Sequence, residues 1–170
     1  MRVDRYGAVD VYYPVSGGAT AALVVATDPS FATLVGEHVV HLSEVAPYRP
    51  GAFYERELPA VAAAVGAVRA PLDLLIVDGY VTLDPAGRPG LGAHVHRELN
   101  VSVVGVAKTG FRGATHAIEV YRGGSRRPLH VTAAGLAPAD AADLVRAMAG
   151  PHRLPDALKR VDTLSRSGPR

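Results

Sequence analysis

Three acidic residues occupy positions at which a carboxylate is costly or unusual, and together they could hold a hard cation. Asp10 lies inside an apolar strand, flanked by Val9 and Val11, where an ionised carboxylate is unfavourable unless it is paired or binds a metal. Asp78 ends another apolar run and precedes a glycine, and Glu57 stands where a proline-rich loop enters a helix. Mg²⁺ takes oxygen ligands and keeps several waters, so a few carboxylates suffice to bind it. Such an ion can activate a water and stabilise the leaving oxygen when a phosphodiester is cleaved.

The same three residues also have an ordinary structural interpretation. Asp10 would then belong to a bulge or a sheet edge, Asp78 would cap a turn, and Glu57 would be solvated on a helix. The pattern of residue types leaves both interpretations open.

The elements that must position these acids begin with strands. Three β-rich segments separated by short turns, residues 6–14, 18–28 and 32–45, predict an antiparallel meander. Residues 51–70 then carry apolar side chains three and four apart, which predicts a helix that starts at Pro59 or is kinked there.

The remaining segments predict the order of the whole fold. We expect strands at 72–80, 101–108, 114–123 and 127–135, and helices at 90–99, 138–150 and 154–166. Three strands, a helix and then strand-helix-strand is the order of the α/β ribonuclease H-like fold, a central mixed β-sheet with helices on both faces. A flavodoxin-like or other α/β sandwich is the alternative.

Composition predicts one folded domain over residues 1–170, with residues 166–170 frayed. The chain has 170 residues, 48% of them hydrophobic, which suits a single core. It contains no cysteine and no apolar run of the roughly 18 residues that a membrane span requires. A cytoplasmic protein without membrane contact and without a thiolate metal site is therefore expected.

Charge is unevenly distributed along the chain. Residues 1–96 carry 6 Lys and Arg against 10 Asp and Glu, whereas residues 97–170 carry 12 against 6. An acidic half for a cation beside a basic half for phosphates suits a metal-dependent nuclease. Ordinary variation with a basic tail is the simpler explanation, so charge alone does not decide.

Four blocks of sequence resemble the endonuclease V family of deoxyinosine-directed nucleases in their order and spacing. They are "VDVYYP", "PYRPGAFYERELP", "DLLIVDGYVTLDPAGRPGLGAHV" and "VSVVGVAKTGF", with a weaker fifth block, "RLPDALKRVD". The resemblance covers nearly the whole chain and implies a ribonuclease H-like fold. It also implies a DNA-repair nuclease that depends on Mg²⁺, for which Mn²⁺ can substitute, and that cuts on the 3′ side of a deoxyinosine, one nucleotide removed. DNA containing deaminated bases is the implied partner, RNA is the alternative, and a monomer is expected.

The resemblance gives roles to individual residues. Asp10, Glu57 and Asp78 match the family's metal-binding carboxylates, and Lys108 matches its active-site lysine, whose charge suits a phosphate. The family's strand-separating wedge, in which the tyrosine fills the space of a displaced base, matches Pro47, Tyr48, Arg49 and Pro50. Its base pocket matches Gly51, Phe53, Gly79 and Val81. Glu55 is then a bystander.

The match departs from the family pattern at three positions. Val81 replaces a glycine of the base pocket, and Asp84 replaces a histidine that acts at the cleaved phosphate. Asp84 is also a candidate fourth acidic metal ligand. Ala134 and Gly135 align with a Gly-His pair of the family, so the histidine is missing.

These departures keep two further hypotheses open. The first is a nucleic-acid-binding ribonuclease H-like protein with reduced or lost cleavage, or with altered base specificity. The second is an unrelated α/β enzyme for a small phosphorylated substrate, which would show no salt-dependent affinity for DNA.

Overall fold

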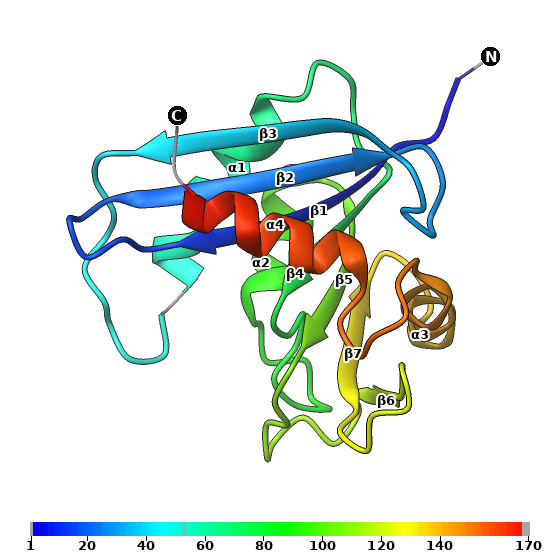
Figure 1. Ribbon diagram of the computed structural model, residues 1–170. Helices are drawn as coiled ribbons and strands as arrows, with labels where there is room; N and C mark the ends of the chain where they lie inside the picture. Colours follow the sequence, from blue (N-terminus) through cyan, green and yellow to red (C-terminus); the bar gives the residue numbers. More distant parts are fainter. Residues whose placement is uncertain (1, 53, 168–170) are drawn as a thin grey trace.

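A seven-stranded mixed β-sheet forms the centre of the molecule in the computed structural model, which describes residues 2–52 and 54–167 (Figure 1). Its strands are β1 (Tyr6–Tyr12), β2 (Ala19–Ala26), β3 (Leu34–Leu42), β4 (Leu74–Asp78), β5 (Ser102–Ala107), β6 (Ile118–Val120) and β7 (Leu129–Ala134). They are ordered β3-β2-β1-β4-β5-β7-β6 across the sheet. The central strands β1, β4 and β5 are parallel, and all other pairings are antiparallel. The predicted meander is confirmed as β1, β2 and β3.

Helices cover both faces of this sheet, as predicted. They are α1 (Tyr54–Gly66), α2 (Leu91–Leu99), α3 (Pro138–Ala147) and α4 (Asp156–Ser167). Successive strand residues point to opposite faces. Ala8 and Ile76 therefore pack in the layer with α3 and α4, whereas Val9 and Leu75 pack in the layer with α1 and α2. Among the residues that the structure describes, no helix is long and apolar enough to cross a bilayer.

Two predicted boundaries were wrong. Helix α1 begins at Tyr54, five residues before Pro59, which lies inside the helix. Pro59 is exposed, so water can reach the Glu55 carbonyl that loses its helical donor there. The strand predicted at 114–123 shrinks to the three residues of β6 because turns occupy both of its ends.

Fraying was predicted for residues 166–170, of which the structure describes only the first two. Arg166 and Ser167 belong to α4, where Arg166 pairs with Asp162 at 2.9 Å and lies over the ring of Tyr12. Residues 168–170 lie outside the described part of the chain. Helix α4 therefore runs along β1 and β2 to its last described residue, as Figure 1 shows.

The parallel strands bring the candidate catalytic residues to one edge of the sheet. Val9 of β1 is in register with Val77 of β4, so Asp10 and Asp78 follow on adjacent strands. Asp78 is in register with Val106 of β5, and Lys108 comes two residues later. Neighbouring strands lie about 4.8 Å apart, so this edge gathers two carboxylates and a lysine.

Candidate active site

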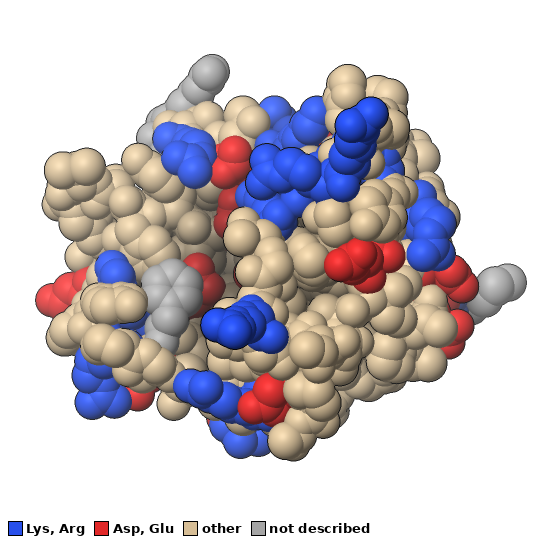
Figure 2. All heavy atoms as spheres, turned by 90° about the horizontal axis from the view of Figure 1, so that it is seen from below, with Lys and Arg blue, Asp and Glu red and all other residues tan. Residues whose placement is uncertain are grey.

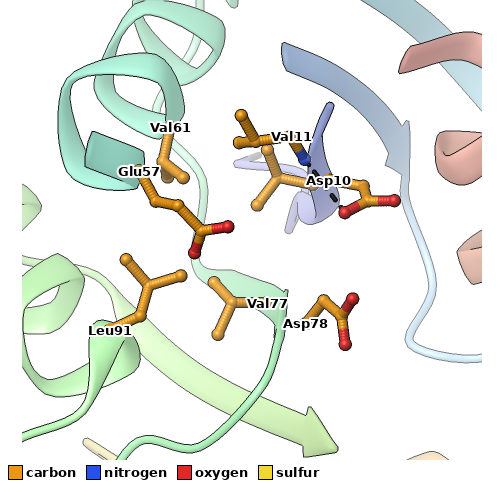
Figure 3. A pocket seen from close by; sticks show the side chains of 8 residues that line it. Asp10, Val11, Glu57, Val61, Val77, Asp78 and Leu91 are labelled. Carbon is orange, nitrogen blue, oxygen red and sulfur yellow. Dashed lines mark hydrogen bonds between the residues drawn. The ribbon is translucent and has the colours of Figure 1, made fainter. Parts of the chain in front are cut away.

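Asp10, Glu57 and Asp78 line one small pocket at the carboxyl edge of the central strands (Figure 3). Its apolar walls come from β1, β4, α1 and α2: Val9, Val11, Val61, Val77 and Leu91. Asp10 and Asp78 also border a second pocket on the α4 side of the sheet, together with Lys108. In Figure 3 Glu57 enters from α1, whereas the carboxylates of Asp10 and Asp78 turn away from it. The three acids therefore approach the end of the sheet from its two faces.

The surroundings of these acids oppose their ionisation. Burial, followed by the charges of Asp78 and Asp10, raises the pKa of Glu57 from 4.5 to about 8. Burial, followed by the charge of Asp78, raises the pKa of Asp10 from 3.8 to about 6. Carboxylates that repel one another in a partly dry pocket are stabilised in their ionised form by a cation between them.

Each aspartate engages a local partner instead of converging with the others. Asp10 accepts a hydrogen bond from the backbone N–H of Val11 at 2.9 Å, and Asp78 lies 3.6 Å from the Lys108 ammonium. Within residues 2–52 and 54–167, no three His, Asp or Glu side chains are arranged to hold one metal ion. The donor set still fits Mg²⁺ in its chemistry, because it offers only carboxylate oxygens and lies next to open solvent.

Lys108 is held in place by Arg153, whose function the sequence did not reveal. The Arg153 guanidinium donates to the carbonyl of Lys108 and, at 2.9 Å each, to those of Arg127 and Pro128. Arg153 thus ties the end of β5 to the start of β7. Its position in the block "RLPDALKRVD" was the signal that could have indicated such a function.

The segment Pro47–Pro50 is an exposed loop that leads into α1. All four of its residues are exposed, and Tyr48 has 62% of its surface accessible. Arg49 pairs with Glu55 at 2.7 Å, and the N–H of Ala52 bonds the Arg49 carbonyl in a turn. Glu55 is therefore more than a bystander, because it fixes the base of this segment to the first turn of α1.

A hollow of about 450 Å³ begins at Gly51, the residue after that segment, and reaches two of the acids. Gly51 and Gly79 line it, as expected of a base pocket, together with Glu57 and Asp78. Tyr54 forms another part of the wall and stacks on His94 with ring centroids 3.6 Å apart. Phe53, also expected in the pocket, lies outside the described residues.

Val81 and Asp84 lie elsewhere than expected. The Val81 side chain is only 1% exposed and packs in the core under α2, because its N–H bonds the Thr132 hydroxyl at 2.8 Å and draws the chain inward. Asp84 lies in a turn, where its carboxylate accepts a hydrogen bond from the N–H of Arg88 at 3.1 Å. Neither residue lines the hollow or the pockets of the three acids.

Tyr80 clamps the loop that follows Lys108. Its hydroxyl donates to the Thr109 carbonyl at 2.8 Å and accepts from the N–H of Phe111 at 2.9 Å. Its ring lies against those of Phe111 and His130. Because Tyr80 also lines the hollow, it connects the hollow to the lysine loop.

We expect Tyr80→Phe to accelerate amide hydrogen exchange at Phe111 roughly two- to tenfold, since a hydrogen bond of this kind contributes about 0.5–1.5 kcal/mol. The measurement is hydrogen exchange followed by NMR or mass spectrometry. Tyr121→Phe is the matched control, because the Tyr121 hydroxyl bonds Glu119 at the surface. Unchanged exchange in Tyr80→Phe would mean that the ring, and not the hydroxyl, orders the loop.

Known proteins match this chain in sequence and in fold. Residues 2–137 match the family model of endonuclease V. The endonuclease V of Streptomyces coelicolor is 32% identical over 185 aligned positions, which cover 96% of this chain and 78% of that protein. That of Azotobacter vinelandii is 36% identical over 109 residues, and the match spans 64% of this chain and only 48% of the relative.

Solved structures show the same fold. The endonuclease V of Streptomyces avermitilis superposes with a TM-score of 0.80 at 27% identity, over 97% of this chain and 81% of that one. The Ciona intestinalis enzyme, in complex with a 23mer DNA containing an inosine followed by a ribo-adenosine, gives 0.80 at 18% identity, over 98% and 85%, a likeness of fold alone. The predicted ribonuclease H-like fold is confirmed. With a family match over residues 2–137, the chain belongs to the endonuclease V family.

Proposed function

We propose that this protein is a Mg²⁺-dependent endonuclease that cleaves DNA on the 3′ side of a deaminated base, deoxyinosine, in nucleic-acid repair. The observation that carries the proposal is one pocket shared by Asp10, Glu57 and Asp78, with Lys108 in the second pocket that Asp10 and Asp78 border and an open hollow beside the acids. The DNA bound by the Ciona relative supports inosine-containing DNA as the substrate.

In this proposal the protein's own residues divide the work between binding and chemistry. Asp10, Glu57 and Asp78 would hold Mg²⁺, which would activate a water and stabilise the leaving oxygen. Lys108 would bind a non-bridging oxygen of the cleaved phosphate, since its side chain is 43% exposed and its ammonium lies beside Asp78.

The exposed segment Pro47–Pro50 and the hollow would select the base. An extruded base leaves a gap in the stack, and the exposed ring of Tyr48 would fill it. The Arg49–Glu55 ion pair would hold this segment in position. The hollow lined by Gly51 and Gly79 would accept the base, with backbone groups that approach it closely because neither glycine carries a side chain.

The test is cleavage of a labelled duplex with a single deoxyinosine, in Mg²⁺ or Mn²⁺, beside an undamaged duplex and the Asp78→Asn protein. A nick one phosphodiester beyond the inosine, present only with the wild-type protein and the damaged strand, supports the proposal. Binding without a nick would favour the nucleic-acid-binding protein that has lost cleavage. The same assay with an inosine-containing RNA distinguishes the two possible partners.

A further inference from the structure

The turn between β6 and β7 carries an uncompensated positive charge. This basic turn, residues 121–128, contains no acidic residue, and Arg126 and Arg127 are both exposed. In the described part of the chain neither of these two arginines forms an ion pair. Their charges are therefore available to a partner outside the molecule.

The basic turn lies at the same edge of the sheet as the three acids. Ala107 of β5 is in register with His130 of β7, so the start of β7 lies next to Lys108. Arg153 bonds the carbonyls of both Lys108 and Arg127 and spans the short distance between them. Figure 2 shows Lys and Arg side chains gathered on this end of the molecule, beside a hollow in which acidic side chains are recessed.

Arg122 and Arg153 hold the basic turn in place through hydrogen bonds to backbone carbonyls. The buried Arg122 donates to carbonyls at the end of α3 and just beyond it, among them Val145, Met148 and Gly150, each at 2.9 Å. Arg153 fixes the other end of the turn through Arg127 and Pro128. Both guanidinium groups are hydrogen-bonded to backbone carbonyls of the protein and so hold the backbone of the turn in place. Arg126 and Arg127 face solvent from this turn.

The positive charges in this region repel one another. Burial, followed by the charge of Arg127, lowers the pKa of Arg153. Exposed aromatic rings accompany the arginines, since Tyr121 is 54% and Phe111 46% accessible. Arginines interleaved with exposed rings suit a nucleic-acid backbone with its sugars and bases.

The spacing of the β-strands gives the distance, counted in nucleotides of a bound DNA strand, between the basic turn and the acids. The strand order β4-β5-β7-β6 places the β6–β7 hairpin two to three strand spacings from Asp78, or roughly 10–14 Å at about 4.8 Å each. One DNA strand advances about 3.4 Å per nucleotide along the helix axis, so the turn would lie roughly three to four nucleotides from the bond at the acids.

We propose that the basic turn is a second nucleic-acid contact, which binds backbone phosphates roughly three to four nucleotides from the cleaved bond. The location of the cleaved bond rests on the proposed function, whereas the affinity of the turn for phosphates does not. Arg126 and Arg127 make the contacts, and Arg122 and Arg153 position them.

The experiment measures the affinity of a fluorescent DNA duplex by anisotropy over a range of salt concentrations, in EDTA so that no strand is cut. The proteins are wild type, Arg126→Ser, Arg127→Ser and the double variant. Each neutralised phosphate contributes about 0.9 to the slope of log affinity against log salt, so the double variant should lose nearly two and bind roughly tenfold more weakly at low salt. Each single variant should lose about half of that slope.

Arg69→Ser is the matched control, because Arg69 is an exposed arginine beyond the end of α1, near the start of β4, at the opposite edge of the sheet. It should keep the wild-type slope. A wild-type slope in the double variant, or an equal loss in Arg69→Ser, would overturn the inference. A protein that does not nick inosine DNA but shows the predicted change of slope would refute the proposed function and leave this contact standing.

Discussion

Replacing Glu57 by glutamine is expected to stabilise the folded protein at pH 8 and to abolish strand cleavage. Burial and the charges of Asp78 and Asp10 raise the pKa of Glu57 to about 8, so its ionised form is disfavoured in the folded state. Glutamine has a similar shape and no charge. Because Glu57→Gln removes the cost of an ionised Glu57 in the folded state, it should increase the free energy of unfolding by about 2 kcal/mol and Tm by roughly 4–8 °C.

The pH dependence has a definite sign. The folded protein holds the Glu57 proton more tightly than the unfolded chain, so this group's contribution to stability is complete below pH 4.5 and is lost as pH rises to about 8. Asp10 acts in the same direction between its ordinary pKa of 3.8 and about 6. Thermal melts without divalent cation should therefore show wild type and Glu57→Gln converging near pH 4.5 and diverging toward pH 8.

A divalent cation should reverse the order of Tm between wild type and Glu57→Gln. Mg²⁺ or Mn²⁺ is expected to raise Tm of the wild type, because a bound cation removes the repulsion among the acids, and to raise Tm of Glu57→Gln much less. Glu55→Gln is the matched control, as Glu55 lies one half-turn away on α1 and pairs with Arg49 outside the pocket. A variant at Glu57 that melted like wild type at pH 8, with or without cation, would show that the three acids do not form one electrostatic unit.

The sequence could predict that Asp10 and Asp78 are neighbours, but it could not predict from which side Glu57 approaches them. The strand that ends at Asp78 is a buried apolar run, typical of a parallel strand, and the ribonuclease H-like order sets the first strand beside it, as β1 beside β4, so Asp10 and Asp78 are neighbours. Glu57 reaches the pocket from the opposite face, because α1 and α4 cover different sides of the sheet. Periodicity locates a helix but does not say which face it will cover.

Sequence proximity was misleading just after Asp78. Val81 and Asp84 follow it closely, and both were expected at the site. The chain instead reverses at Gly79, whose φ of +116° suits glycine alone, and Val81 is drawn into the core by Thr132, 51 residues later. The bracing of Lys108 by Arg153 likewise joins residues 45 apart. Such long-range bonds leave no local pattern.

Lys108→Ala is expected to lower the rate of strand cleavage by roughly 10²–10³, the effect of removing one donor that stabilises charge in a transition state. Its ammonium lies 3.6 Å from the Asp78 carboxylate, and the residue lines the second pocket that Asp10 and Asp78 border. The chain contains one other lysine, Lys159, exposed on α4. Lys159→Ala is therefore the matched control, and it should cleave at the wild-type rate.

Variants of Lys108 and of the acids should differ in how Tm responds to a divalent cation. Lys108 lowers the pKa of Asp10, so removing it makes the pocket more negative and should leave the rise of Tm with Mn²⁺ undiminished or larger. Glu57→Gln should lose that rise. A Lys108→Ala protein that lost both cleavage and its response to Mn²⁺ would show that the lysine organises the acids, whereas loss of cleavage alone assigns it to the phosphate.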